Sequence, residues 1–403
     1  MIPTLNPFAE RPRVTRWGEE AEMREVEADE ILSGPAPTTW QDLSNRASAL
    51  YLTGLTDEAL AVAFQAHAEN RCVPTLVNLA VILETLGVFE AALLYIRDAC
   101  TIDPADDRAH AMYGESLLRL GRFAEGWPLY ATQRAAHGWI RPYVREWEGP
   151  HQALSGKRLL VIEGGGYGDN IYFLRWLDTL RRWGARIDYI CQPSFAPLVR
   201  RLGYRAIENW AGNIDLKFRD YDYFTSLLAL GWKLGVTLEN YRWSGPYIKE
   251  KRPWWRGSVL RARPRIGICW RAGEGRSPRK QRSLNNLQLR HVVEALPLRC
   301  RWVNLTHDHP HPDMPNPDLS TWLDTARAVA DLDLLVSVDT GVAHLGGAMD
   351  VPTWTVLPGA AAWQYPVGYD THPLYPSMRV FRNQGEGIDD AVTSLILALK
   401  ALG

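Results

Sequence analysis

The pattern of apolar and polar positions is most informative between Leu332 and Pro358, where the chain reads LDLLVSVDTGVAHLGGAMDVPTWTVLP. An apolar run, Leu334–Val338, leads into Asp339-Thr340-Gly341; small and apolar residues at helical spacing follow, and a second apolar run, Trp354–Leu357, ends the stretch. This order predicts a strand, a tight turn, a helix and a second strand parallel to the first. Parallel sheets bind ligands at the carboxyl ends of their strands, and a helix N-terminus there attracts phosphate. We therefore predict a phosphate site at Thr340-Gly341.

Short apolar strands and amphipathic helices also alternate along two longer regions of the chain. In 151–250, the predicted elements are strands at 157–162, 186–191, 204–207 and 221–224 and helices at 170–183, 195–202 and 227–234. In 251–403, besides the stretch above, they are strands at 265–270, 301–305 and 378–381 and helices at 287–296, 325–331 and 388–402. A linker rich in Pro, Trp and charge, 245–263, separates the two series. The pattern predicts two Rossmann-like α/β halves.

An internal repeat precedes these two halves. Residues 83–93 match residues 117–127 at an offset of 34, and a third match, 50–60, lies 33 residues earlier. A period of 34 residues with a central Gly and a small residue five positions later resembles the tetratricopeptide repeat, a pair of antiparallel helices. The small residues, which let helices approach closely, are Ala59, Ala92 and Gly126. The alternative is a generic helical bundle with chance similarity.

These patterns divide the chain into four parts. We predict an irregular N-terminal arm at 1–36 with room for one solvated helix, the helical repeats and a connector at 37–150, and the α/β halves at 151–250 and 251–403. Helical repeats carry no chemistry of their own. We expect them to bind a protein partner, to self-associate or to position a substrate.

Composition narrows the class of protein. Hydrophobic residues make up 46% and charged residues 23% of the chain, and the net charge of −1 supplies no field that would attract nucleic acid or an anionic membrane. The five cysteines are odd in number and form no CxxC pair, which favours reduced thiols. The N-terminal residues lack an apolar signal core, and no run approaches the roughly 18 apolar residues of a membrane span. We predict a cytoplasmic protein without a membrane span.

A glycine-rich turn, Gly164–Gly168, follows the first strand of 151–250. It fails the dinucleotide-binding fingerprint because Asp169 stands where the last Gly should be, so NAD is not a predicted cofactor. Asp169 then has two interpretations. It is a general base that takes a proton from an acceptor hydroxyl, or a helix cap that pairs with backbone N–H groups.

A cationic loop follows the first strand of 251–403. It runs from Arg271 to Ser283 and contains five Lys or Arg residues. Arg binds a diphosphate through two parallel N–H groups, whereas a solvated charged loop is the alternative for most of these residues. Arg271 and Arg282 are the predicted ligands because a strand end and a helix start hold them. His344, one helical turn beyond Thr340, is a further candidate for a phosphate or ribose contact, with simple packing as its alternative.

The sequence predicts no metal site. His307, His309 and His311 alternate along a Pro-rich loop, so they point to different sides, and no second ligand cluster pairs with them. Asp331 and Asp333 straddle a helix end and a strand start, away from the strand ends where Mg²⁺ and a nucleotide diphosphate would bind. We expect Arg side chains and the helix dipole to hold a diphosphate without a metal or other cofactor.

Together these motifs make 155–403 resemble the two-domain GT-B glycosyltransferases of the heptosyltransferase type. The bacterial branch with tetratricopeptide repeats fused in front is the most similar, a layout also seen in O-linked N-acetylglucosamine transferases. The motifs that carry the resemblance are Gly166–Asn170, Ile266–Trp270 with Arg282-Ser283-Leu284, Asp324-Thr325-Ala326, Ser337–Leu345 and Tyr375–Arg382.

The resemblance implies roles for the candidate residues. Asp169 falls where heptosyltransferases place their catalytic base. The segment 359–363 departs from the Asp-Trp-Arg type of sequence expected there, so the resemblance does not name the donor sugar. The implied donor contacts, to the diphosphate and sugar of a nucleotide diphosphate sugar, are Asp339, Thr340, Gly341 and His344 with Arg271, Arg282 and Ser283, and the implied acceptor-side loop is Gly166, Tyr167 and Gly168.

We therefore predict a metal-independent, inverting glycosyltransferase that moves a hexose or heptose from a nucleotide diphosphate sugar to a hydroxyl of a glycan or protein acceptor. The first alternative is a repeat-based interaction scaffold with a non-catalytic GT-B part. A nucleotide-sugar epimerase and a transferase acting on DNA bases are further alternatives. The repeats favour a macromolecular acceptor over the epimerase, and a neutral chain without a basic stripe gives DNA no support.

Overall fold

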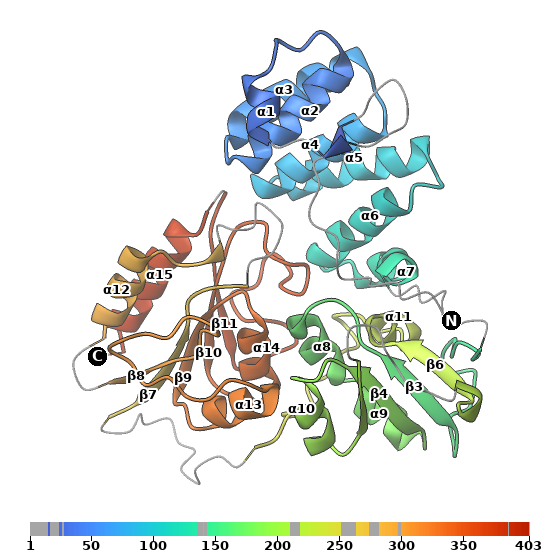
Figure 1. The fold of residues 1–403 in the computed structure, drawn as a ribbon, viewed down its shortest axis with the longest axis vertical. Helices are drawn as coiled ribbons and strands as arrows, with labels where there is room; N and C mark the ends of the chain where they lie inside the picture. The colour runs from blue at the N-terminus through green and yellow to red at the C-terminus, as the bar shows by residue number, and fades with distance from the viewer. Residues whose placement is uncertain are drawn as a thin grey trace.

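The architecture is taken from a computed structural model, which describes residues 28–134, 140, 143–209, 218–250, 263–273, 282–296, 300–385 and 387–402. Two short antiparallel strands, β1 (Thr15–Arg16) and β2 (Arg24–Glu25), precede them. Figure 1 shows three parts: a helical arm at the top and two α/β halves side by side below it.

Helix pairs form the upper part. A short helix, α1 (Ala28–Ser33), precedes them. In the pairs that follow, a Gly with positive φ separates the two helices: Gly54 at 85°, Gly87 at 80° and Gly121 at 77°. Such a φ ends a helix without strain because Gly has no Cβ. The three units in register that the period predicts are confirmed as α2 (Trp40–Leu52) with α3 (Thr56–Glu69), α4 (Val73–Thr85) with α5 (Phe89–Ile102), and α6 (Asp107–Arg119) with α7 (Phe123–Arg134).

Small residues set the distance between the helices of each pair. Ala59 and Ala92 are completely buried. In the third unit a Cβ on Gly126 would lie 2.9 Å from the carbonyl oxygen of Gly114, so α6 and α7 touch through their backbones. The predicted role of the small positions is therefore confirmed.

The first α/β half contains a parallel sheet of four strands in the order β5-β4-β3-β6. Strands β3, β4 and β6 are buried on both faces, as expected for a sheet covered by helices, whereas the residues of the edge strand β5 are partly or fully exposed. Strand β6 lies two residues later than predicted, at Tyr223–Ser226. The remaining elements are β3 (Arg158–Ile162), β4 (Arg186–Cys191), β5 (Arg205–Glu208), α8 (Tyr167–Leu174), α9 (Leu177–Arg182), α10 (Ala196–Arg201), α11 (Leu230–Lys233) and the short 3₁₀ turns Phe218–Asp220 and Leu227–Ala229.

The prediction of one continuous helix over 170–183 is wrong, because α8 and α9 are separate helices. The chain turns at Arg175 and Trp176, between the two helices. The Arg175 guanidinium is buried, where Nε donates to the Tyr172 carbonyl at 2.7 Å and Nη1 donates to the Leu374 carbonyl of the other half at 3.0 Å. The hydrophobic period of the sequence does not reveal these contacts.

The second half contains a parallel sheet of five strands in the order β11-β10-β9-β7-β8. The chain moves outward from β7 to β8 and then returns to the other side of β7 with β9. A crevice at such a reversal is where open α/β sheets bind ligands. The elements are β7 (Arg265–Cys269), β8 (Arg301–Asn304), β9 (Leu334–Val338), β10 (Thr353–Leu357), β11 (Met378–Arg382), α12 (Asn286–Glu294), α13 (Trp322–Ala330), α14 (Gly341–Ala348) and α15 (Asp389–Lys400).

The two parallel-sheet halves have the GT-B arrangement that the sequence predicts, and the third helix pair is packed against both. The Trp127 indole of α7 donates to the Val236 carbonyl of the first half at 2.7 Å. Arg119 of α6 pairs with Glu84 at 2.5 Å and donates from Nε to the Ala361 carbonyl of the second half at 3.1 Å. All five cysteines are free thiols. Among the described residues, no helix has both the length and the apolar character needed to cross a membrane.

Candidate active site

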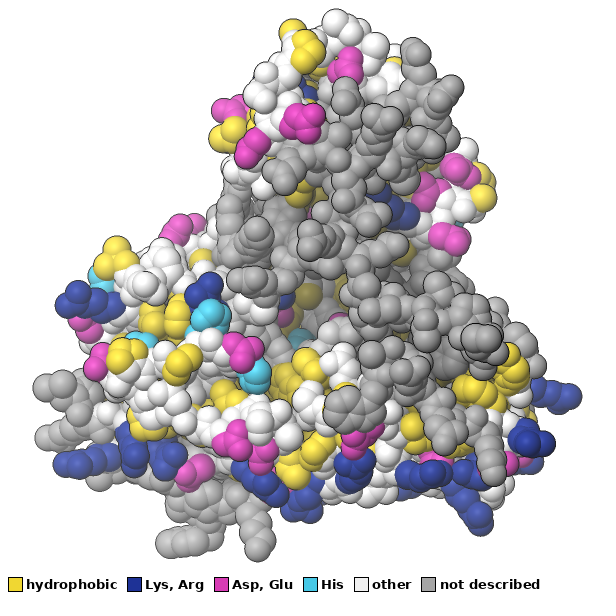
Figure 2. All heavy atoms as spheres, in the orientation of Figure 1, with side chains coloured by type: hydrophobic (Ala, Val, Ile, Leu, Met, Phe, Trp, Pro, Cys, Tyr) yellow, Lys and Arg dark blue, Asp and Glu magenta, His cyan; other side chains and the backbone are white. Residues whose placement is uncertain are grey.

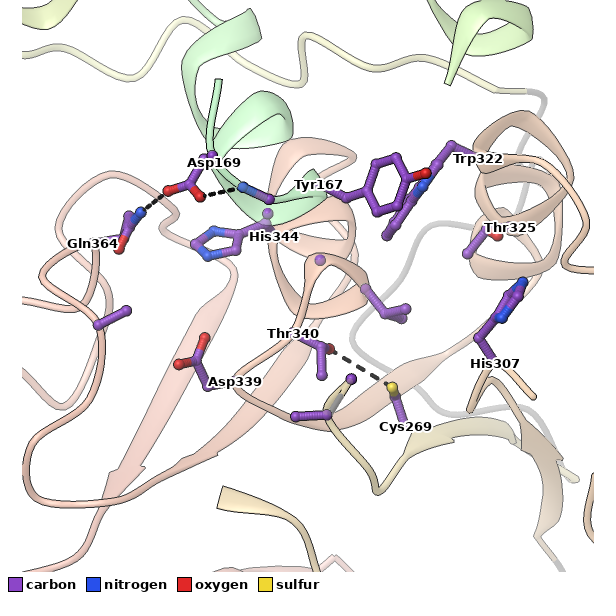
Figure 3. A pocket seen from close by; sticks show the side chains of 18 of the residues that line it. Tyr167, Asp169, Cys269, His307, Trp322, Thr325, Asp339, Thr340, His344 and Gln364 are labelled. Carbon is purple, nitrogen blue, oxygen red and sulfur yellow. Dashed lines mark hydrogen bonds between the residues drawn. The ribbon is translucent and has the colours of Figure 1, made fainter. Parts of the chain in front are cut away.

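A cleft of about 1430 Å³ opens where the two halves and the third repeat unit meet. Its walls come from the carboxyl ends of β3, β7, β8 and β9, from the first turns of α8 and α14, and from the loop after β10 (Figure 3). The repeats contribute Glu115 of α6 and Tyr130 of α7 to the lining. The cleft therefore lies where the sequence placed the phosphate site.

Thr340 forms the N-cap of α14. Its Oγ1 accepts a hydrogen bond from the Ala343 amide at 3.4 Å, lies 3.0 Å from Ser337 Oγ and donates to Cys269 Sγ at 3.6 Å (Figure 3). The Thr340 hydroxyl thus forms its hydrogen bonds within the protein. The amides of the first helical residues, Gly341 and Val342, have no acceptor inside the helix. The capacity of this turn to hold an anion therefore rests on backbone N–H groups and the helix dipole.

Glycines bring the N-termini of α8 and α14 together. A Cβ on Gly341 would lie 2.5 Å from the Trp322 ring and 3.3 Å from the Gly168 amide nitrogen, and a Cβ on Gly168 would lie 2.9 Å from the His344 ring. Any larger residue would separate the two helix ends. The positive ends of two helix dipoles therefore face the same part of the cleft.

Asp169 lies at the third position of α8 and lines the cleft. Its Oδ2 accepts a hydrogen bond from the Gly166 amide at 2.7 Å, and its Oδ1 accepts one from the side-chain amide of Gln364, in the other half (Figure 3). The carboxylate therefore caps the start of α8, which agrees with the interpretation of Asp169 as a helix cap. It also faces the cleft from the first half, which the interpretation as a base requires.

Arg271 and Arg282 both line the cleft. Arg282 Nη1 lies 3.4 Å from Asp339 Oδ2, and the Asp339 side chain is almost completely buried. Of the other predicted residues of this loop, Ser283 does not line the cleft, because its hydroxyl accepts a hydrogen bond from the Ala272 amide at 3.0 Å and so holds the loop. Arg276, Arg279 and Lys280 lie outside the described residues.

His344 is buried beneath the first turn of α14. Burial lowers its pKa to about 4, although the nearby Asp339 carboxylate acts in the opposite direction and the Arg175 cation adds to the lowering. The ring is therefore neutral at pH 7. Its Nδ1 has no hydrogen-bond partner within the described parts of the chain. A neutral imidazole contacts a ligand through hydrogen bonds and supplies no positive charge to a phosphate.

The predicted acceptor-side loop places an aromatic ring, that of Tyr167, in the cleft. The Tyr167 hydroxyl donates to Gln192 Oε1 at 2.5 Å and lies 2.7 Å from Ser194 Oγ, so it is held within the first half. Its ring lies 5.0 Å from the Trp322 ring of the other half (Figure 3). Gly166 and Gly168, the other predicted residues of this loop, line the cleft as well.

Several lining residues carry no signal in the sequence. Trp322 belongs to α13, which begins three residues before the predicted start because the Thr321 hydroxyl accepts the Asp324 amide and caps it. Gln364 follows a strand in a loop without periodicity. Cys269 and Thr325 lie in motifs that carry the resemblance, whereas the lining residues missed by sequence reasoning include Glu115, Tyr130, Ser194, Trp322 and Gln364.

The residues weighed as metal ligands do not form a cluster. No group of three or more His, Cys, Asp or Glu side chains that could hold a metal ion occurs in the part of the chain that the structure describes. His307 and His309 line the cleft, whereas His311 accepts the Asp313 amide at 3.2 Å. Asp331 and Asp333 both contact Arg265 at the amino end of β7, away from the cleft.

Comparison with known proteins gives distant similarities, and no family model matches the sequence. Protein FlbA of Caulobacter vibrioides is 25% identical over 354 residues, which are 75% of this chain and 57% of that protein. The chain thus spans little more than half the length of this relative.

Solved structures with similarity to the chain include bacterial transferases. E. coli ADP-heptose LPS heptosyltransferase II is 16% identical, and the match covers 60% of this chain and 99% of that chain with a TM-score of 0.42. E. coli heptosyltransferase WaaC with ADP-2-deoxy-2-fluoro heptose is 15% identical, and the match covers 60% of this chain and 99% of that chain with a TM-score of 0.39. A mutant O-GlcNAc transferase of Thermobaculum terrenum is 14% identical, and the match covers 90% of this chain and 83% of that chain with a TM-score of 0.31. With TM-scores of 0.42 and below, the assignment of the fold rests on the chain's own sheets and helix pairs.

Proposed function

We propose that the protein is a glycosyltransferase that takes a sugar from a nucleotide diphosphate sugar and transfers it to a hydroxyl of a glycan or protein acceptor. The observation that carries the proposal is the pairing of two sites across one cleft. The second half offers the N-terminus of α14 with Arg271 and Arg282, and the first half offers the Asp169 carboxylate. An anion site facing a carboxylate suits a reaction in which an anionic leaving group departs as a hydroxyl is deprotonated.

The donor diphosphate would bind the second half. The amides at Gly341 and Val342 and the helix dipole favour negative charge, and two guanidinium groups add hydrogen bonds with full positive charge. Arg282 already pairs with Asp339, which orients its guanidinium toward the cleft. As a neutral ring, His344 would add only a hydrogen bond to phosphate or sugar.

In the reaction, Asp169 would take the proton from the acceptor hydroxyl as its oxygen attacks the anomeric carbon. The new carbon–oxygen bond forms on the face opposite the leaving group, and the bond between the anomeric carbon and the diphosphate oxygen breaks, so the configuration inverts. Backbone amides and Arg side chains would stabilise the charge on the leaving diphosphate. Each carboxylate oxygen can accept more than one hydrogen bond, so Asp169 can retain the contacts to Gly166 and Gln364 while it receives the acceptor.

The repeats would select the acceptor. Glu115 and Tyr130 place the third unit in the wall of the cleft, so an acceptor that enters beside them contacts the repeats and Asp169 together. A macromolecule suits such an entrance better than a small sugar does. Figure 2 shows Lys and Arg side chains along the edge farthest from the repeats. Cations of the first half pair with carboxylates, as Arg201 does with Glu250 at 2.6 Å, so we do not propose a nucleic-acid acceptor.

Calorimetry with a panel of ADP, GDP and UDP and their sugar derivatives tests the donor assignment. We expect the wild type to bind at least one nucleoside diphosphate, and Arg282→Gln to bind it about tenfold more weakly because a charge-assisted hydrogen bond is lost. Arg290→Gln is the matched control, since Arg290 lies on the surface of α12, where it pairs with the exposed Glu294 at 2.9 Å, and does not line the cleft. Absence of binding by the wild type to every member of the panel would favour the interaction scaffold.

A further inference from the structure

The loop after β10 is held rigidly where it enters the cleft. Arg382 donates to the Gly359 carbonyl at 3.0 Å and to the Tyr365 carbonyl at 2.6 Å. His372 Nδ1 accepts the Leu374 amide at 3.0 Å, so its proton resides on Nε2, which donates to the Gln364 carbonyl at 2.8 Å. The backbone of Gln364 is therefore fixed from both sides.

The side chain of Gln364 is fixed as well. Only its amide nitrogen can donate to the Asp169 carboxylate, so the contact between the two determines which way the amide faces. Its carbonyl oxygen, Oε1, must then point away from Asp169. That oxygen is buried, and it has no hydrogen-bond partner among the residues described. Gln364 as a whole is 5% exposed and lines the cleft.

A second unpaired polar atom lies in the same part of the cleft. His344 Nδ1 is buried without a partner in the described residues, and Figure 3 shows His344, Gln364 and Asp169 around one space above Asp339. Leaving a buried polar atom unpaired costs about 1–3 kcal/mol. A carbonyl oxygen accepts hydrogen bonds and cannot donate one, so a phosphate oxygen cannot satisfy it. A hydroxyl can.

We propose that Gln364 is a positioning residue of the transferase, whose amide nitrogen orients the Asp169 base and whose Oε1 accepts a hydrogen bond from a hydroxyl of the donor sugar. The inference rests on the proposed function. The sugar of a donor anchored at the N-terminus of α14 would lie beside this loop, which belongs to the same half. Gln364 would thereby connect the position of the sugar in one half to the orientation of the carboxylate in the other.

The test compares Gln364→Ala and Gln364→Glu with the wild type. Calorimetry measures the affinity for the nucleoside diphosphate (ADP, GDP or UDP) and for the matching nucleotide sugar that the wild type uses, and turnover is followed by release of the diphosphate. In Gln364→Ala we expect diphosphate affinity within twofold of the wild type, at least a fivefold loss of the extra affinity that the sugar provides, and at least a tenfold lower kcat.

Gln364→Glu supplies a readout that a purely structural role would not change. A second carboxylate against Asp169 disfavours ionisation of both, so the acid limb of the pH profile of kcat/KM should move to higher pH. Gln288→Ala is the matched control, because Gln288 donates an equivalent hydrogen bond to Asp389 at 2.6 Å on the exposed surface. Turnover and sugar affinity like the wild type in Gln364→Ala, or an unmoved acid limb in Gln364→Glu, would overturn the inference while leaving the transferase assignment intact. A wild type that binds and turns over no donor would instead refute the proposed function.

Discussion

Asp169 and His344 lie in one cleft but in different environments. Asp169 accepts hydrogen bonds from Gly166 and Gln364 at the edge of the first half. His344 is enclosed by aromatic rings, with Tyr365 at 5.1 Å and Tyr172 at 5.8 Å between ring centroids. Because burial keeps His344 neutral at pH 7, the charge of the diphosphate in the proposed donor would be met by the Arg side chains and the backbone amides.

Glu163, at the end of β3, gives a prediction for stability against pH. Burial raises its pKa to about 7 from an ordinary 4.5, although the Gln192 amide, which donates to it at 3.1 Å, acts in the opposite direction. The protonated form therefore stabilises the fold fully below pH 4.5, and this stabilisation is lost as the pH rises through about 7. Glu163→Gln mimics the protonated form. Its free energy of unfolding should exceed that of the wild type by about 1–3 kcal/mol at pH 8 and match it at pH 4.

Urea unfolding of both proteins at the two pH values measures the difference. A constant gap between the variant and the wild type at both pH values would show that folding does not shift the pKa of Glu163.

At the scale of elements, local pattern predicts strands well and helix ends poorly. Strand β9 lies where the apolar run places it, at Leu334–Val338, and Thr340 and Gly341 of the turn after it line the cleft. Periodicity reports which face of a helix is buried, but it does not report that Arg175, between α8 and α9, donates to the Leu374 carbonyl in the other half. Thr340 and Gly341 could be found because a strand, a turn and a helix are contiguous in sequence. Gln364 could not, because its contact with Asp169 joins positions 195 apart.

The backbone contact between α6 and α7 predicts the effect of a single methyl group. In Gly126→Ala the new Cβ would lie 2.9 Å from the Gly114 carbonyl oxygen and 3.0 Å from the Leu118 amide nitrogen, and neither can move without moving the helix. We expect a loss of about 1–3 kcal/mol in the free energy of unfolding. Gly273→Ala, whose Cβ would have nothing within 4 Å, is the control and should change it by less than about 0.5 kcal/mol. Equal stability of the two variants would contradict the packing described for the third unit.

At the scale of the whole molecule, buried cations connect the three parts. Arg119 joins the repeats to the second half, and Arg175 joins the first half to the second. Arg175 lies 4.4 Å from the Tyr172 ring centroid and 4.3 Å from that of Tyr375, and among the described residues it forms no ion pair. Partners of this kind favour a cation through ring faces and carbonyl dipoles. The sequence predicts the three parts but not these contacts between them, since each contact joins residues that are far apart in the chain.

Arg175→Met should therefore loosen the two halves. We expect the free energy of unfolding to fall by about 3 kcal/mol, because hydrogen bonds from a charged donor to the Tyr172 and Leu374 carbonyls are lost. Small-angle scattering should show a larger radius of gyration than in the wild type. Arg181→Met is the control, since Arg181 is exposed and lies over the ring of Tyr204 within one half. The same loss in both variants, or an unchanged radius for Arg175→Met, would argue against a tie between the halves.

The central claim is that the cleft transfers sugar with Asp169 as its base, and Asp169→Asn tests it most directly. Asn keeps an oxygen that can accept the Gly166 amide but has no basicity. We measure donor-dependent release of nucleoside diphosphate together with nucleotide affinity by calorimetry. The account predicts a turnover at least a hundredfold lower with affinity within twofold of the wild type. Turnover equal to that of the wild type would contradict it.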